Sequence, residues 1–413
     1  MSPATAITRR APIRIQRTQS ANAPASYWLL LAFLLLLYAN TPKVMPALEV
    51  VHPAAVIGGL ALLALTVEVL VGGRKFSFGW PEGGLLLAFC GAAAFSCLSA
   101  LWPGHAVDAL SDLVKMSLVF FFMVNSATTE GRLRGVIWAM VVGGLFPALG
   151  TLSHYHSGNL EEGRAAWVGI FANPNEVAYS LVILLPLAAY LALTYGWLVR
   201  IALAGVSASY LGAIFVTFSR GGLVGLMVVL AIFAWRKRSI WLRAGMVLAL
   251  VAGAYVAQNH WTRSEDFSQL GNDLSFQQRI ATSQVGLSMF ADHPLSGVGL
   301  GCSVIAWPLY APRGLYTTGA LVTHNTIVQV LGETGVLGAI PFLVMIGLGL
   351  YHARQIALYS SRPNLGTAIE AALWGLVACG MSGGYVLTWF PYLLLGLIAT
   401  AWALPPQEVE ANS

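Results

Sequence analysis

Long apolar runs separated by short polar breaks constrain the fold of this chain more than any other feature. Most of these runs approach the roughly 20 residues that an α-helix needs to cross a bilayer. Within the hydrocarbon core every backbone N–H and C=O needs a partner in the protein, and a helix satisfies these groups internally. The sequence therefore predicts an all-α, polytopic membrane protein with about twelve transmembrane helices. The predicted spans lie near residues 27–42, 53–72, 82–101, 107–126, 134–152, 174–195, 200–218, 221–235, 244–259, 336–352, 366–384 and 387–404.

The composition supports the same class of protein. Charged residues make up only 9% of the 413 residues and hydrophobic residues 57%, with a mean hydropathy of +0.72. A soluble domain carries roughly 25% charged residues, so the composition excludes a soluble protein. The four cysteines show neither a disulfide framework nor the paired spacing of a zinc site.

The distribution of positive charge predicts the orientation, because Lys and Arg in short loops favour the cytoplasm. With the N-terminus inside and the chain alternating at each span, fifteen of the 22 Lys and Arg residues are cytoplasmic and six lie opposite. Both ends are thus expected in the cytoplasm, and the N-terminal tail is expected to remain uncleaved. The predicted parts are a tail of residues 1–26, a membrane domain of residues 27–404 and a tail of residues 405–413.

Two segments on the outer side, residues 153–173 and 260–335, are long enough to contribute to a site. The ionisable candidates on that side are Arg164, Arg220, Arg279 and His324, with Lys115 just beneath. Lys115 also lies at helical spacing from Asp112, so a local ion pair is the simpler interpretation. The outer carboxylates show no ligand spacing, and we expect neither a metal nor a cofactor.

Arg220 is predicted at the tip of a turn between two helices. The apolar stretch of residues 200–235 is too long for one span and is interrupted by "SRGG". Gly221 and Gly222 are expected to form the tight turn. A guanidinium at this position suits phosphate oxygens, and contact with lipid phosphates is the alternative.

Arg279 is predicted on an amphipathic helix lying on the membrane surface. Such a helix directs the guanidinium either towards a site or towards water. The apolar positions expected on it are Ile280, Val285, Leu287 and Phe290. The glycines that follow the helix and permit close backbone approach are Gly297, Gly299 and Gly301.

His324 lies where the outer segment returns to the membrane. An unperturbed imidazole has a pKa of about 6.5, which makes it a usable general base. Asn325 is positioned to orient the imidazole or to bind a sugar hydroxyl. A structural role for His324 is the alternative, in which case the base would be one of the nearby carboxylates. These carboxylates are Asp108, Asp112 and Glu333.

The sixth predicted span begins with Asn173, Pro174 and Asn175. Asn173 suits a helix cap and Pro174 suits the first turn. Capping is sufficient to explain these residues, although such a helix end also attracts anions.

Four segments in this order resemble the O-antigen ligase and polymerase superfamily of bacterial envelopes. They are "GIFANPNEVA", "TFSRGGLVGL", "RIATSQVGLSMFADHPLSGVGLG" and "THNTIVQVLGETGVLG". The resemblance covers roughly residues 160–350. It implies a membrane glycosyltransferase of the C-type architecture in the bacterial inner membrane, with its site facing the periplasm. No cofactor is implied.

The resemblance also implies roles for individual residues. Arg220 and Arg279 match arginines that engage the diphosphate of an undecaprenyl-diphosphate-linked glycan, and Arg164 is a third candidate for that contact. His324 matches the proposed base. Asn325, Asn175, Lys115 and Glu333 are supporting candidates. Direct attack would invert the anomeric carbon, with arginines taking the place of a metal.

The acceptor distinguishes the two branches of this superfamily. Ligases transfer to lipid A–core, and polymerases transfer to another lipid-linked repeat, within an envelope polysaccharide assembly complex. Polymerases often carry R-x10-G elements in their outer loops, and no arginine of the predicted outer segments has this spacing. This absence favours a ligase. A flippase or other transporter is a third possibility, but it would predict charges along a path through mid-membrane.

Overall fold

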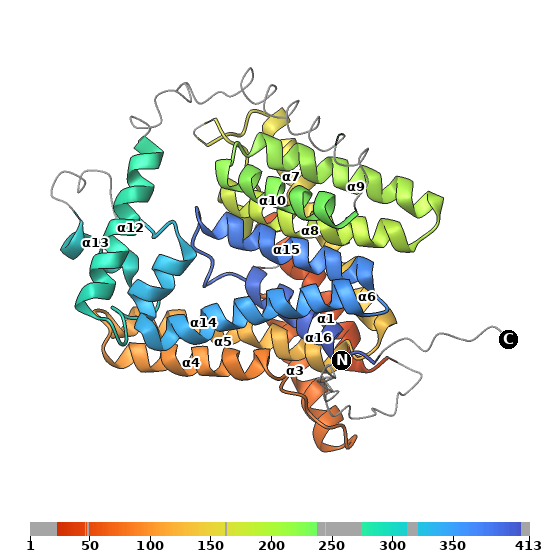
Figure 1. Cartoon of the computed structure of the whole chain (residues 1–413), viewed down its shortest axis with the longest axis horizontal. Helices are drawn as coiled ribbons and strands as arrows, with labels where there is room; N and C mark the ends of the chain where they lie inside the picture. The colour runs from red at the N-terminus through yellow and green to blue at the C-terminus, as the bar shows by residue number, and fades with distance from the viewer. Residues whose placement is uncertain are drawn as a thin grey trace, which may run out of the picture.

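The computed structural model describes residues 23–45, 47, 49–161, 163–237, 244, 274–311 and 321–405. Within these ranges the chain is built of α-helices, and the β pairing consists of one isolated bridge between Glu161 and Arg164 (Figure 1). The predicted all-α class is confirmed. The predicted span 244–259 lies outside the described residues except for Ala244, as do most of both predicted tails.

The helices follow the apolar runs closely in the first half of the chain. They are α1 (Ala25–Ala39), α2 (Thr41–Val44), α3 (Pro53–Leu70), α4 (Glu82–Leu98), α5 (Pro103–Ser126), α6 (Glu130–Gly143), α7 (Leu145–His156), the short η2 (Gly169–Phe171) and α8 (Pro174–Thr194). The second half contains α9 (Trp197–Val216), α10 (Arg220–Lys237), α12 (Leu274–Asp292), α13 (Ser303–Tyr310), α14 (Thr326–Tyr359), α15 (Pro363–Gly380) and α16 (Phe390–Ala403).

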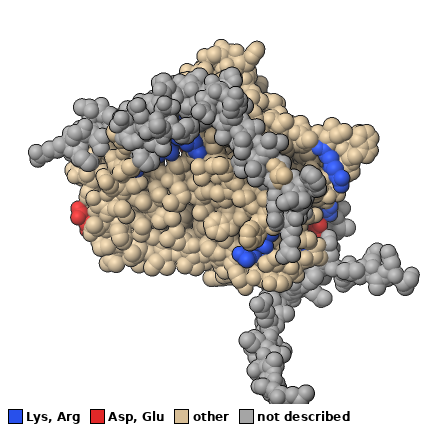
Figure 2. Space-filling model, turned by 45° about the horizontal axis from the view of Figure 1, so that its top comes forward, with Lys and Arg blue, Asp and Glu red and all other residues tan. Residues whose placement is uncertain are grey.

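The surface and the helix lengths are those of a membrane protein. Among the described residues, five helical segments are long and apolar enough to cross a bilayer: α3, α6 with α7, α8, α9 and α14. Three shorter apolar helices, α1, α4 and α16, accompany them. Figure 2 shows a face on which charged side chains are sparse and most of the described surface is uncharged. The total of twelve spans stays a prediction.

The centre of the bundle is formed by α8 and α15, which pack against each other and against α10. Small residues allow this close packing, as is common between membrane helices. A Cβ added at Gly225 on α10 would come within 2.3 Å of the Sγ of Cys379 on α15. Helix α14 packs on α15 from another side and also contacts α4, so it links the central helices to the N-terminal ones.

Contacts between loops support the predicted alternation of the two sides. Residues of the predicted cytoplasmic loops or adjoining helix ends pair with one another, and we call this side of the bundle the inner end. Its pairs include Arg74–Glu68, Arg236–Glu370, Arg362–Glu130 and His352–Glu82. Residues of the predicted outer segments likewise contact one another, and we call their side the outer end. Its contacts include Asn40–Val168, Ser99–Ser296, Arg164–Asn175 and Thr326–Gly383.

Two features of the outer end differ from expectation, and a third agrees with it. Helix α14 begins at Thr326, ten residues before the predicted span at 336, and contains a break at Gly335. Helix α15 ends at Gly380 and α16 begins at Phe390, so the predicted spans 366–384 and 387–404 are separated by a longer connection, residues 381–389. The amphipathic helix is present as α12, which in Figure 1 runs across the end of α4 and α14.

One face of α12 packs on the protein. Its buried hydrophobic positions are Ala281, Val285 and Met289, spaced four residues apart, whereas Ile280 and Leu287 are exposed. Val285 therefore packs on the protein, whereas Ile280 and Leu287 are left on the outside, where the predicted contact of this helix with the membrane surface stays a prediction. The helix turns its small and flexible residues to the protein.

Candidate active site

Arg220 lies at the first position of α10, directly after the turn from α9. The turn itself is made by Phe218 in the left-handed region (φ 47°), and both glycines already belong to the helix. The predicted role of Gly221 and Gly222 in the turn was therefore wrong. They are needed for packing instead, because a Cβ on Gly221 would come 2.0 Å from Ser382 Oγ and one on Gly222 2.6 Å from Ala178 Cβ.

Asn175 connects Arg220 to the loop that carries Arg164. Its Oδ1 accepts hydrogen bonds from Arg164 Nη2 and from Ser219 Oγ, both at 2.8 Å. Arg164 Nε also donates to the Thr217 carbonyl at 2.9 Å. Arg164 therefore contacts the start of α8 through Asn175 and the end of α9 through Thr217. Ser219, which shares the Asn175 oxygen with Arg164, directly precedes Arg220.

The predicted cap of α8 is confirmed in the structure. Asn173 Oδ1 accepts a hydrogen bond from the Asn175 amide at 2.8 Å, and Pro174 occupies the first turn. The cap fixes the backbone of Asn175, the residue that binds Arg164. The amide end of α8 consequently lies beside the loop that carries Arg164.

His324 and Arg279 come from separate elements and lie close enough to interact electrostatically. Burial and the charge of Arg279 hold the pKa of His324 below its ordinary value of 6.5. Both side chains are half-buried. This environment favours a neutral imidazole near pH 7, which is the form that accepts a proton.

Asn325 caps α14. Its Oδ1 accepts hydrogen bonds from the amides of Ile327 at 3.0 Å and Val328 at 3.2 Å. These bonds hold the helix start that immediately follows His324, so Asn325 positions the histidine through the backbone. Binding of a sugar by Asn325 stays a prediction.

A group of residues that sequence reasoning missed links the Arg220 side to the His324 side. The hydroxyl of Tyr179 on α8 lies 3.2 Å from both the carbonyl and the Oγ of Ser382. The next residue, Gly383, accepts a hydrogen bond from Thr326 Oγ1 at 2.8 Å. Arg279 also lies within electrostatic range of Tyr179. The signal for this connection was "MSGG" at residues 381–384, where small residues interrupt an apolar run.

Two supporting candidates have structural partners. Lys115 Nζ lies 2.9 Å from Asp112 Oδ1, and both side chains are exposed, which confirms the local ion pair. Glu333 is 1% exposed, and its carboxylate accepts a hydrogen bond from Ser303 Oγ at 2.6 Å. The structure therefore places Glu333 inside the protein rather than on the surface of a site.

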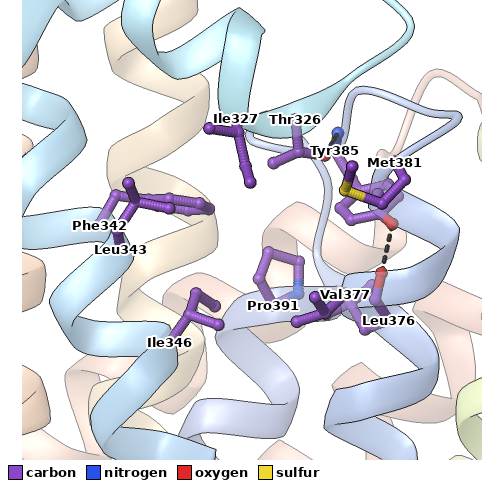
Figure 3. A pocket seen from close by; sticks show the side chains of 11 residues that line it. Thr326, Ile327, Phe342, Leu343, Ile346, Leu376, Val377, Met381, Tyr385 and Pro391 are labelled. Carbon is purple, nitrogen blue, oxygen red and sulfur yellow. Dashed lines mark hydrogen bonds between the residues drawn. The ribbon is translucent and has the colours of Figure 1, made fainter.

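An apolar pocket lies next to the start of α14. Thr326 and Ile327 line its upper side, and Ile346 and Val377 its lower side (Figure 3). Tyr385 lines it as well, and the ring of Tyr385 packs edge-on against Tyr179 at 5.8 Å between centroids. The pocket is formed between α14, α15 and α16, and it adjoins the polar residues described above. An apolar chain placed there would contact Thr326, which follows His324 by two residues.

Comparison with known families agrees with the resemblance seen in the sequence. Residues 201–343 match the family model described as O-antigen ligase. This region includes Arg220, Arg279 and His324, whereas Arg164 and Tyr179 precede it. A search of curated proteins gives no match. The predicted resemblance to the O-antigen ligase superfamily is thereby confirmed, and the match supports a membrane enzyme of polysaccharide biosynthesis.

Proposed function

We propose that this protein is an O-antigen ligase-type glycosyltransferase of the bacterial inner membrane. It moves a glycan from undecaprenyl diphosphate to an acceptor sugar, lipid A–core, at the periplasmic face. The observation that carries the proposal is that His324 lies within electrostatic range of Arg279, close in the chain to an apolar pocket that begins at Thr326 at the outer end. A lipid-linked diphosphate needs these three surroundings together: a base, a cation and an apolar surface.

The chemistry follows from the charges that change during transfer. The acceptor hydroxyl attacks the anomeric carbon, and its oxygen forms the new glycosidic bond while the bond to the diphosphate oxygen breaks. His324 takes the hydroxyl proton, for which a neutral imidazole is required. Arg220 and Arg279 stabilise the negative charge on the departing undecaprenyl diphosphate. A single displacement inverts the configuration, and in this scheme guanidinium groups supply the charge that a metal would otherwise supply.

The remaining residues hold this arrangement. Arg164 is anchored to Asn175 and Thr217 and adds positive charge beside the start of α10. The pocket walls, among them Ile346 and Leu376, accept isoprene units of the carrier. Apolar walls beside a polar rim allow the lipid to remain in the membrane phase while the sugars remain in water.

Reconstitution tests the proposal directly. The purified protein is placed in liposomes with a radiolabelled glycan on undecaprenyl diphosphate and with lipid A–core, and product is resolved by gel electrophoresis. We expect label on lipid A–core and none with His324→Gln. Label on a second lipid-linked glycan would identify a polymerase instead. Movement of donor across the bilayer without transfer would replace the proposal with a flippase.

A further inference from the structure

Helix α14 is interrupted at its outer third. Gly335 has φ 60° and ψ −162°, which breaks the helix between its first ten residues and the rest. The segment 294–303, which follows α12, fills this break. The amides of Val298 and Gly299 donate to the carbonyls of Gly332 and Glu333, at 2.9 and 3.1 Å. In return the Val336 amide donates to the Pro294 carbonyl at 2.9 Å.

The side chain of Glu333 reinforces the same junction. Its Oε1 accepts from Ser303 Oγ at 2.6 Å, and its Oε2 accepts from the Gly301 amide at 3.0 Å. Gln329 Nε2 lies 3.4 Å from both oxygens. Both carboxylate oxygens therefore have partners within the protein, and with 1% exposure Glu333 cannot reach a substrate.

Glycines make the close approach possible on both sides of the junction. Gly297 has φ +67°, and a Cβ there would lie 2.3 Å from the carbonyl carbon of Glu333. A Cβ on Gly335 would lie 2.3 Å from the carbonyl carbon of Leu295. Nearer the site, a Cβ on Gly286 of α12 would come 2.5 Å from Val328 of α14. Helices α12 and α14 are thus connected through the 294–303 segment and pack closely at Gly286 and Val328.

These contacts connect the two elements that carry the base and one of the phosphate-binding arginines. Arg279 lies on α12, and His324 directly precedes α14. We propose that Glu333 is a positioning residue, which clamps the 294–303 segment to α14 and thereby holds Arg279 at its working distance from His324. This inference rests on the proposed function for its effect on turnover, but its geometric content can be measured without any substrate.

The test uses the reactivity of His324. Diethyl pyrocarbonate modifies neutral imidazole, so the pH dependence of His324 labelling, followed by peptide mass spectrometry, reports how strongly the ring is held neutral. In Glu333→Ala and Ser303→Ala we expect the clamp to loosen and Arg279 to move away from His324. The pH at which half of His324 is labelled should then rise, because the ring is protonated more easily. Turnover falls by up to about 10²-fold, the effect of a displacement of about 1 Å at a reacting centre.

Two further variants make the test specific. Glu333→Gln keeps the size of the side chain, an acceptor for the Gly301 amide and a donor for Ser303, so it should retain most of the wild-type behaviour. Ser288→Ala is the matched control, because Ser288 lies exposed on α12 and its Oγ donates to the Gln284 carbonyl of its own helix at 3.1 Å. It should change neither labelling nor turnover.

The outcomes separate the two proposals. If Glu333→Ala does not fold, Ser303→Ala decides, since it removes one hydrogen bond from the same carboxylate. Unchanged His324 labelling in Ser303→Ala and in any folded Glu333→Ala protein would overturn the clamp, whatever the turnover. A wild-type protein that transfers no glycan would count against the proposed function, while a shift in labelling would still support the clamp.

Discussion

The two ends of α14 hold histidines in opposite surroundings. Near the inner end, His352 is 5% exposed, its Nδ1 is bonded to the Glu82 carboxylate, and its ring stacks on Trp402 with centroids 4.2 Å apart. At the outer end, His324 is half-buried and lies within electrostatic range of a guanidinium, that of Arg279. One histidine has an acidic neighbour and the other a basic one.

Under the proposed function, this difference separates a structural histidine from the catalytic base. His352 joins α14 to α4 and α16, because Glu82 and Trp402 belong to those two helices. His324 has in Arg279 a charge that opposes its protonation, and an apolar pocket begins two residues further along the chain, at Thr326. A buried polar contact adds stability. A neutral imidazole near a cation can instead act as a base close to the group that stabilises the negative leaving group.

The largest effect is expected from substituting each of these two histidines separately. His324→Gln should lose about 10²–10⁴-fold in turnover, because an amide has hydrogen bonds but no basicity. His352→Ala should instead lower the free energy of unfolding by about 1–3 kcal/mol, since it removes the partner of a buried carboxylate. Single-turnover rates and thermal unfolding, both measured on each variant, check this. A near-normal rate for His324→Gln would reduce that residue to a structural role.

A smaller effect is expected from the arginines at the two ends. Arg220→Ala should lose about 10²–10³-fold in turnover, the typical cost of removing one group that stabilises an oxyanion. Arg220→Lys should restore little of it, because lysine lacks the planar fork of donors. Arg236 at the inner end forms two hydrogen bonds from Nη2 to Glu370, at 2.6 and 2.7 Å, and serves as the matched control.

Arg236→Ala should lower protein stability and leave donor binding intact in the molecules that remain folded. Donor affinity is measured by scintillation proximity with radiolabelled undecaprenyl diphosphate. Wild-type affinity in Arg220→Ala would contradict the assignment of Arg220 to the diphosphate.

The sequence was sufficient to predict the all-α class and the approximate positions of most long described helices, because the length of an apolar run depends on the thickness of a bilayer and not on tertiary contacts. It also indicated His324, Arg220 and Arg279, through residue chemistry and the family resemblance. The connection at residues 381–389 was partly hidden, since Ser382 and Gly383 interrupt the apolar run too briefly to end a predicted span.

Features that depend on contacts between distant segments were not predictable. Glu333 is separated by thirty residues from Ser303, and nothing local to either indicates that they meet. The burial of Ala281 and Met289 on α12 is decided by which helix packs on it, not by hydrophobicity alone. Tyr179 lies in a run of apolar residues, where its hydroxyl gives no sign of the distant Ser382.

The finest test of the contrast between the histidines is the pH dependence of transfer. Burial and Arg279 hold the pKa of His324 below 6.5, and the base must be neutral to act. Wild-type kcat/KM, which reports the free enzyme, should therefore persist below pH 6.5 and fall only at more acid pH. Arg279→Ala removes the repulsion that opposes protonation, so the pKa rises and the acid limb should move to higher pH. Arg279→Lys keeps the charge and should leave the limb in place, even if its rate is lower. An acid limb that is identical in the wild-type, alanine and lysine proteins would mean that Arg279 does not control the protonation of His324, and the basic half of the contrast with His352 would then be lost.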